Sequence, residues 1–344
     1  MSRITWEKLV DFSAEVLGAL GMTEEDAQYV AEIAVMTEAM GITTHGLSML
    51  GYLDGKFGGG VDPKAQPCLV KDKGAGACID AHVCAGPLAI RMATHIAMEK
   101  ARGYGVGMVA VRNSLWVGAL GVYLVPLAEE GLLAQAWAQA TKCKDCAPVG
   151  GMEARFSTNP VAMAIPTYGE PIVADFSTAA VSMGKVHQMS RRGYKTPEPL
   201  FRDKDGNLTD DPAVVQQGGT ILFKGGVSGG HHGYAFSLWC EALSAVAGGS
   251  CNNPEAEQRQ NFTVLAADPQ FFGGNDHYYA EMKRFTAHVL SSRTLPDVDE
   301  IRLPGQRAFR SLREAIEHGV EVDEDRAKQL ADLAGKHGLK SPVG

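Results

Sequence analysis

The stretch THGLSMLGY (residues 44–52) follows a helical pattern and decides how the rest of the chain is interpreted. The ordinary pKa of histidine lies near neutrality, so the ring of His45 can pass a proton to or from a reacting carbonyl, alcohol or imine. Gly46 beside it allows another molecule to approach the ring closely. A single histidine after a helix is more often a cap or a packed side chain. The remainder of the sequence has to decide between these two interpretations.

The composition is that of a globular protein with a mild excess of acidic residues. The chain has 344 residues, of which 45% are hydrophobic, and a formal net charge of -8. Phosphate neutralisation needs clustered Lys and Arg, so this balance argues against nucleic acid as a partner. Residues 1–21 carry charges at helical spacing, and no apolar run has the length of a membrane span. We therefore expect a cytoplasmic protein without a membrane partner.

The seven cysteines are expected to be reduced, because their number is odd and no signal sequence is readable. Cys143 and Cys146 alone have the spacing of metal ligands. One C-x2-C pair supplies two of the four ligands of a structural zinc, and no second pair lies elsewhere in the sequence. This pattern favours a surface loop and no metal, with a zinc-dependent hydrolase as a remote alternative.

Hydrophobic periodicity divides the chain into three parts. The first 40 residues are helical in pattern, strands and helices alternate from residue 77 to residue 292, and residues 307–337 are again helical. We expect a helical segment at 1–72, an α/β domain at 73–305 and a helical segment at 306–344 that packs with the first. No strand is followed by a G-x-G-x-x-G that opens a helix, which disfavours a Rossmann fold.

Further motifs follow residues 44–52 in a fixed order over roughly 300 residues. They are Asn113-Ser114, Gly118, Gly121 and Tyr123; Thr158-Asn159-Pro160; Asp175-Phe176-Ser177-Thr178; Gly184-Lys185; Asp205-Gly206-Asn207; Gly230-His231-His232-Gly233-Tyr234; and Leu303-Pro304-Gly305-Gln306. This series resembles the malate/L-lactate dehydrogenase superfamily, which includes ureidoglycolate, sulfolactate and diketogulonate oxidoreductases.

The resemblance implies a fold and a reaction. The fold would be a non-Rossmann α/β fold with a mixed, largely antiparallel sheet, and the protein would be a homodimer. The reaction would be hydride transfer between NAD or NADP, which the sequence does not distinguish, and the C-OH, C=O or C=N carbon of a small polar metabolite.

The resemblance also implies roles for individual residues. His45 would be the proton donor in reduction and the acceptor in oxidation. The substrate pocket would contain Thr44, Met49, Tyr52 and Trp116. The cofactor would be held by the α/β domain through Asn159, Asp175, Phe176, Ser177, Thr178, His231, His232, Pro304, Gly305 and Gln306.

Most of these cofactor residues fall in three segments, 175–178, 229–233 and 304–306, and each segment also has a simpler interpretation. Residues 175–178 follow an apolar strand, where Asp and Ser often cap the strand end. Residues 229–233 form a glycine-rich stretch whose amides could make an anion nest, although a flexible loop is the simpler prediction. Residues 304–306 are a turn before a helix, and only the resemblance gives them a function. Glu241, within an apolar helix, is interpreted as a buried structural acid.

Three positions depart from the family pattern. Met49 replaces an arginine that could clamp a substrate carboxylate, Trp116 replaces a histidine, and His232 replaces a lysine. The pocket should therefore be more apolar and aromatic than in relatives that have these residues. Another cation could restore the carboxylate anchor; the candidates are Arg112, Arg191, Arg192 and Lys195. The alternative function is a dinucleotide-binding homologue whose catalysis is lost or altered.

Overall fold

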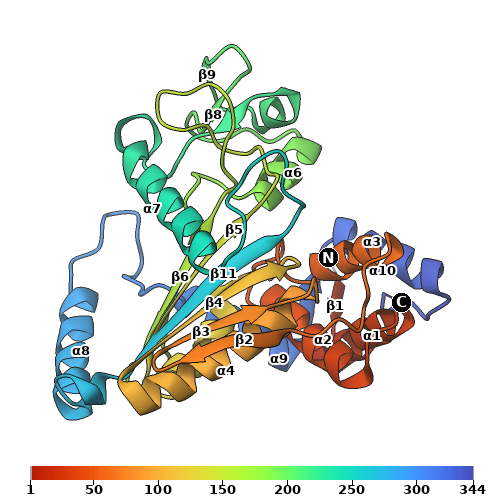
Figure 1. Cartoon of the computed structure of the whole chain (residues 1–344). Helices are drawn as coiled ribbons and strands as arrows, with labels where there is room; N and C mark the ends of the chain where they lie inside the picture. Colours follow the sequence, from red (N-terminus) through yellow and green to blue (C-terminus); the bar gives the residue numbers. More distant parts are fainter. Residues whose placement is uncertain (1, 344) are drawn as a thin grey trace.

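A seven-stranded sheet forms the centre of the computed structural model, which describes residues 2–343 (Figure 1). Only β3 and β4 are parallel neighbours, and the other five pairings are antiparallel. The sheet is thus mixed and largely antiparallel, as expected. In spatial order its strands are β2 (Cys68–Lys73), β3 (Gly76–Asp80), β4 (Val106–Ser114), β11 (Gln260–Ala267), β5 (Leu133–Ala140), β6 (Pro160–Ile165) and β7 (Ile172–Ser177).

Small residues bring the helices close to this sheet. Helix α4 (Gly86–Tyr104) buries Ala89, Ala93, Ala97 and Ala101, which recur every four residues and so share one helix face. Helix α5 (Gly121–Glu129) packs beside α4 on β5, β6 and β7. Helix α7 (Gly226–Val246) contacts β4, β5 and β11 and lies on the other side of the sheet from α4 (Figure 1).

The two ends of the chain meet in a helical region beside the sheet (Figure 1). Strand β1 (Ser2–Ile4) pairs antiparallel with β12 (Val320–Val322). Around this pair lie α1 (Trp6–Ala19), α2 (Glu24–Ala39), α3 (Ser48–Gly58), α9 (Gln306–His318) and α10 (Glu324–His337).

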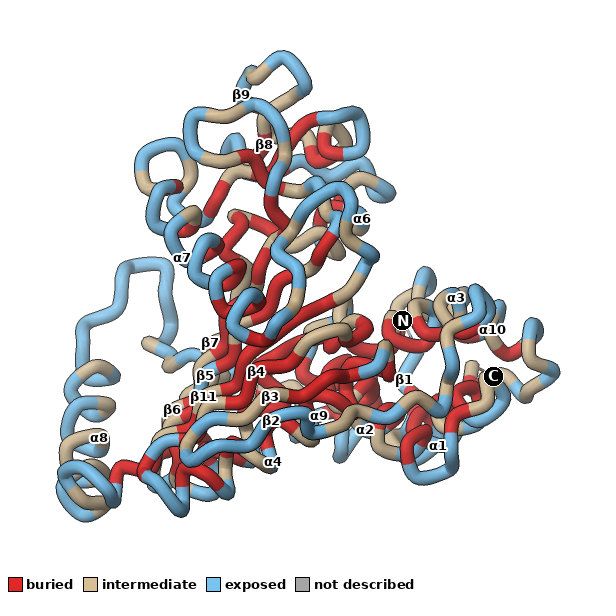
Figure 2. The backbone as a smooth tube through the Cα atoms, viewed as in Figure 1, coloured by how far each residue is buried: buried red, intermediate tan, exposed pale blue. Residues whose placement is uncertain are grey.

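A second, smaller hydrophobic core, distinct from that of the sheet, includes Val186, Phe201, Ile221 and Phe223. Figure 2 shows buried backbone both in this part and along the central sheet. Its elements are α6 (Met183–Arg192), β8 (Phe201–Arg202), β9 (Leu208–Thr209), the 3-10 helix η1 (Pro212–Gln217) and β10 (Thr220–Ile221).

Several details differ from the sequence predictions. Residues 229–233 are not a loop, because they lie inside α7. The C-terminal helical stretch is interrupted by β12, and α3 was not foreseen. The expected domain boundary between residues 72 and 73 lies inside β2, just before its last residue. After β11, the 3-10 helix η2 (Pro269–Phe271) leads to α8 (Asn275–Leu290), which projects from the body. Within residues 2–343, none of the helices is long and apolar enough to cross a membrane.

Candidate active site

His45 lies in a tight turn between α2 and α3, where its N–H donates to the carbonyl of Ile42 at 2.9 Å. The following residue has to be glycine, because a side chain at Gly46 would place its Cβ 2.5 Å from Oε2 of Glu38. The turn therefore packs directly against the end of α2, and this contact holds the histidine backbone.

The ring of His45 lies in a half-buried aromatic environment. Its Nδ1 is 2.8 Å from Oγ1 of Thr44, and its centroid is 5.3 Å from that of Trp116. Tyr52 contacts the same indole edge-on at 5.4 Å, and its hydroxyl accepts a hydrogen bond from the backbone N–H of Trp116. This burial lowers the pKa of His45 to about 4. The imidazole is therefore neutral near pH 7 and able to accept a proton.

Met49 has a different environment from the other expected pocket residues. Its side chain is 2% exposed and belongs to the main hydrophobic core. Gly118 packs against the Met49 methyl group and the carbonyl of His45. Met49, at the position where the resemblance implies an arginine, thus packs in the core against the segment that contacts the histidine turn. Its side chain does not face solvent.

The segment 116–121 links this histidine to the first expected cofactor segment. The N–H of Gly121 donates to Oδ2 of Asp175 at 2.8 Å, at the end of β7. Asp175 reaches solvent but stands in a hollow whose walls displace most of the surrounding water. This desolvation raises its pKa to about 6, against the opposing effect of the N–H groups of Gly121 and Leu120.

The turn 304–306 lies beside the same strand. The N–H of Val173 donates to the carbonyl of Pro304 at 3.1 Å. Gly305 has φ +94°, and a Cβ there would lie 3.0 Å from the nitrogen of Val173, so only glycine fits without strain. Gln306 closes the turn by accepting from Leu303. Asp175, Gly121, Gly305 and Arg307 line a hollow of about 210 Å³ at the start of α9.

The third expected segment is arranged differently. His231 and His232 are exposed on α7, with ring centroids 4.0 Å apart. Since the amides of this segment belong to a helix, the predicted anion nest is not formed there. The helix still approaches the end of β7, because Gly233 packs against the backbone of Thr178 and Lys224.

Several neighbouring polar groups are occupied within the protein. The hydroxyls of Ser177 and Thr178 donate to the carbonyls of Ala179 and Thr158. Phe176 lies under Nζ of Lys224 at 5.5 Å. Buried Asn159 donates to Glu241 at 3.0 Å, while its own Oδ1 has no partner among the described residues. Glu241 also accepts from the N–H of Asn252, which agrees with a structural acid.

A larger cavity of about 490 Å³ opens between α6 and the helical region. Thr44 lines it, and Gly184 at the start of α6 packs directly against Thr44. Of the four candidate carboxylate anchors, Arg112 pairs with Asp80, Arg192 with Asp323 and Asp325, and Lys195 with Asp210. Arg191 also lines the cavity and makes no ion pair within residues 2–343.

The Cys143–Cys146 pair shows no features of a metal centre. Burial raises the pKa of both thiols, that of Cys143 to about 12. Across residues 2–343, no group of three or more His, Cys, Asp or Glu side chains is arranged to hold a metal ion.

Sequence reasoning missed the groups that hold the histidine turn. Glu38 and Arg326 form a buried ion pair against this turn, and α6 closes over Thr44. The one available signal was an acid inside the apolar stretch of α2, seven positions before His45. Nothing in the sequence indicated its partner, which comes from α10.

Comparison with known proteins agrees with this architecture. The family model described as malate/L-lactate dehydrogenase matches residues 4–331, and the chain belongs to this family. It is 31% identical to malate dehydrogenase of Pyrococcus abyssi, covering 98% of this chain and 96% of the relative. It is 30% identical to a Delta(1)-pyrroline-2-carboxylate/Delta(1)-piperideine-2-carboxylate reductase of Pseudomonas syringae pv. tomato, covering 96% of each.

The solved structure of malate dehydrogenase from Pyrococcus horikoshii OT3 superimposes with a TM-score of 0.89 at 28% identity, covering 99% of this chain and 97% of that one. Together these relatives make the protein an oxidoreductase of small metabolites.

Proposed function

We propose that the protein is an NAD(P)-dependent dehydrogenase or reductase that acts at the C-OH, C=O or C=N carbon of a small polar metabolite. The observation that carries this proposal is the segment 116–121, which contacts His45 at one end and Asp175 at the other. Hydride transfer needs a proton-transfer group held next to the cofactor. A single short segment connects the two candidates for these tasks.

The residues around Asp175 fit part of a nicotinamide dinucleotide. The bound cofactor would supply or accept the hydride. The carboxylate of Asp175 can accept hydrogen bonds from ribose hydroxyls, and the first amides of α9 together with Arg307 suit a phosphate. The hollow is too small for a whole dinucleotide and suits one ribose phosphate portion. Asp175 favours a ribose with a free 2′-hydroxyl, as in NAD, whereas Arg307 favours a 2′-phosphate, as in NADP. The site is therefore compatible with either cofactor.

His45 would carry the proton. In oxidation its neutral ring would accept a proton from the substrate hydroxyl, and in reduction the protonated ring would return it. The low pKa in the free protein opposes the protonated state. A substrate carboxylate close to the ring would raise this pKa by charge attraction, which couples proton uptake to the binding of an acidic substrate.

The alternative is a dinucleotide-binding homologue without turnover, which the replacements at Met49 and Trp116 favour. Titration with NADH and NADPH, followed by nicotinamide absorbance assays against 2-oxo acids, cyclic imines and neutral ketones, separates the two. Binding followed by turnover supports the enzyme. Binding without turnover across this panel supports the alternative, and no binding at millimolar cofactor contradicts both. His45→Ala should lower any turnover by about 100-fold or more.

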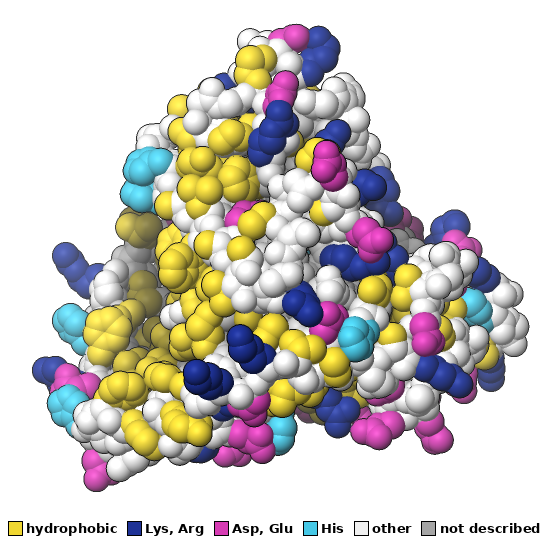
Figure 3. Space-filling view, in the orientation of Figure 1, with side chains coloured by type: hydrophobic (Ala, Val, Ile, Leu, Met, Phe, Trp, Pro, Cys, Tyr) yellow, Lys and Arg dark blue, Asp and Glu magenta, His cyan; other side chains and the backbone are white. Residues whose placement is uncertain are grey.

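We further propose a homodimer. Helix α7 exposes Phe236, Leu238, Trp239 and Val246, and none of the residues of α8, all of them described, is buried. Figure 3 shows hydrophobic side chains gathered in a band from α7 towards the sheet and α8. A continuous apolar surface of this kind suits a second copy of the chain. Light scattering at micromolar concentration tests the mass.

A further inference from the structure

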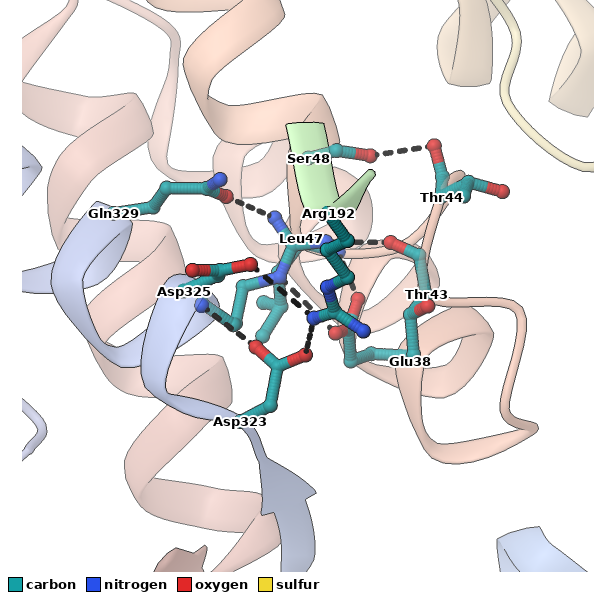
Figure 4. A network of polar contacts seen from close by, with 10 residues as sticks. Glu38, Thr43, Thr44, Leu47, Ser48, Arg192, Asp323, Asp325 and Gln329 are labelled. Carbon is teal, nitrogen blue, oxygen red and sulfur yellow. Dashed lines mark hydrogen bonds and ion pairs between the residues drawn. The ribbon is translucent and has the colours of Figure 1, made fainter. Parts of the chain in front are cut away.

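A buried ion pair holds both ends of the turn that carries His45 (Figure 4). Oε2 of Glu38 accepts a hydrogen bond from the N–H of Leu47 at 2.8 Å, just after the histidine. Arg326 donates to the carbonyl of Thr43, just before it. The two side chains also pair with each other, with 3.1 Å between Nε of Arg326 and Oε1 of Glu38. One ion pair thus contacts the turn on each side of His45.

The pair is deeply buried, since the side chains of Arg326 and Glu38 are 12% and 2% exposed. Burial of Glu38 raises its pKa, while Arg326 and the N–H of Leu47 oppose this shift. Taking two charges out of water costs several kcal/mol each, and a well-packed apolar pair is often at least as stable. A gain in stability therefore does not explain why an ion pair, and not an apolar pair, is found here. The directional hydrogen bonds that the two side chains make to the turn provide a better explanation.

The guanidinium of Arg326 is fixed in direction by its other contacts. Besides Glu38 and Thr43, it donates to Oε1 of Gln329 at 2.6 Å. Its own backbone N–H donates to Asp323, which caps the start of α10. A planar guanidinium can make these bonds in three directions at once, whereas the ammonium of lysine has a different geometry.

We propose that Glu38 and Arg326 are positioning residues that set the orientation of the His45 ring. By fixing the carbonyl of Thr43 and the N–H of Leu47, they hold the backbone from which the imidazole projects against Trp116. This proposal rests on the proposed role of His45 in proton transfer. Neither residue contacts the ring, so both act through the turn.

The variant Arg326→Met tests the proposal in the full-length protein. Loss of the two-sided grip should misplace the ring and lower kcat by about 10- to 100-fold, while the affinity for NADH or NADPH stays within about threefold. Glu38→Gln keeps an acceptor for the N–H of Leu47 but removes the charge that pairs with Arg326. It should lower kcat less than Arg326→Met does. Arg326→Lys keeps the positive charge but not the planar guanidinium. Its kcat should lie between those of wild type and Arg326→Met.

Lys328→Met is the matched control, because it removes a cation from the same helix whose ion pair is with Asp332. It should change neither kcat nor cofactor affinity. The NMR signal of the His45 ring gives a readout independent of turnover. The chain has ten histidines, so this signal is assigned as the one missing in His45→Ala. It should shift in Arg326→Met and stay in place in Lys328→Met.

A merely structural pair would lower the unfolding temperature of Arg326→Met but leave kcat and the His45 signal unchanged, and that result would overturn the proposal. Should Arg326→Met fail to fold, Arg326→Lys and Glu38→Gln decide by the same readouts. If His45→Ala keeps full turnover, the proton role of His45 in the proposed function fails. The His45 ring signal then decides the positioning role by itself.

Discussion

The indole of Trp116 lies 5.3 Å from the imidazole of His45, with the ring planes inclined by 50°. By the motif resemblance, a second histidine is expected at this position. The aromatic replacement cannot titrate, and it removes water from one side of the ring that we propose as the proton carrier. The tryptophan thereby contributes to the burial that lowers the pKa of His45.

The pH dependence of activity should reflect this environment. A base must be neutral, so kcat/KM for oxidation should be full above about pH 5 and should fall as the pH drops through about 4. In Trp116→Ala, water reaches the ring and this inflection should move up towards the ordinary value of histidine. A pH profile of wild type and variant checks both statements; a wild-type inflection near pH 6.5 would contradict them.

The same shift affects stability in acid. In the unfolded chain His45 has the ordinary histidine pKa of about 6.5, whereas in the folded protein its pKa is about 4. This contribution to stability is fully present above pH 6.5 and is lost as the pH falls towards 4. In His45→Gln, denaturant unfolding should depend less steeply on pH in this window. An unchanged slope would show that the ring is not buried.

Arg191 should anchor the carboxylate of acidic substrates. It lines the cavity beside Thr44 and makes no ion pair within the described chain. Losing a charge-assisted bidentate contact commonly costs about 2 to 4 kcal/mol, so Arg191→Met should lower kcat/KM for 2-oxo acids by about 30- to 1000-fold. Neutral ketones should be unaffected. Lys195→Met, which removes an exposed cation paired with Asp210, is the control; equal losses in both variants would argue for a general charge effect.

Gly305→Ala should weaken cofactor binding. A φ of +94° costs a residue with a side chain about 1 to 2 kcal/mol, and the new Cβ would press on the backbone of Val173. We expect the Kd for NADH or NADPH to rise about tenfold or more in calorimetry. Gly335→Ala, a helical glycine with open space around it, should leave cofactor binding unchanged and add up to ~1 kcal/mol of stability. Equal affinities in both variants would separate the 304–306 turn from the cofactor.

Trp239→Glu should split the proposed dimer. Trp239 is 54% exposed on the apolar face of α7, where a charge would be desolvated by a partner chain. Light scattering should then give the mass of one chain. Ile316→Glu, at an apolar residue 61% exposed on α9, is the matched control and should leave the mass at that of a dimer. A monomeric wild type would contradict the dimer. A dimer that persists in Trp239→Glu would show that the interface does not include this face of α7.

Most of the fold could be predicted, because strands and helices with clear periodicity were identified near their observed positions. β4, for example, begins at Val106 as expected. The order of the sheet could not be derived from local patterns, since β11 inserts between β4 and β5 from far along the chain. The family resemblance implied a mixed, largely antiparallel sheet but gave no strand order. The glycine-rich start of α7 was misjudged, because tertiary packing of Ser237, Cys240 and Leu243 outweighs the weak helix propensity of glycine.

The candidate site was predictable where short motifs carry it and not where distant side chains meet. Motifs placed His45, Asp175 and Gly305, and the structure brings these three segments together through residues 116–121 and β7. The burial of Met49 and the pairing of Glu38 with Arg326 depend on packing between elements that are far apart in sequence. Such contacts leave no local pattern, because each residue alone resembles an ordinary core or surface position.

The grip of Arg326 on Thr43 spans 283 residues, so the histidine turn depends on a part of the chain that is synthesised late. During translation at about 5 to 20 residues per second, this turn waits on the order of tens of seconds for the guanidinium that secures it. A nascent chain can therefore assemble its central sheet while the turn around His45 is still loosely held. On this view the histidine turn is secured only after α10 has been synthesised and has packed against the first helices.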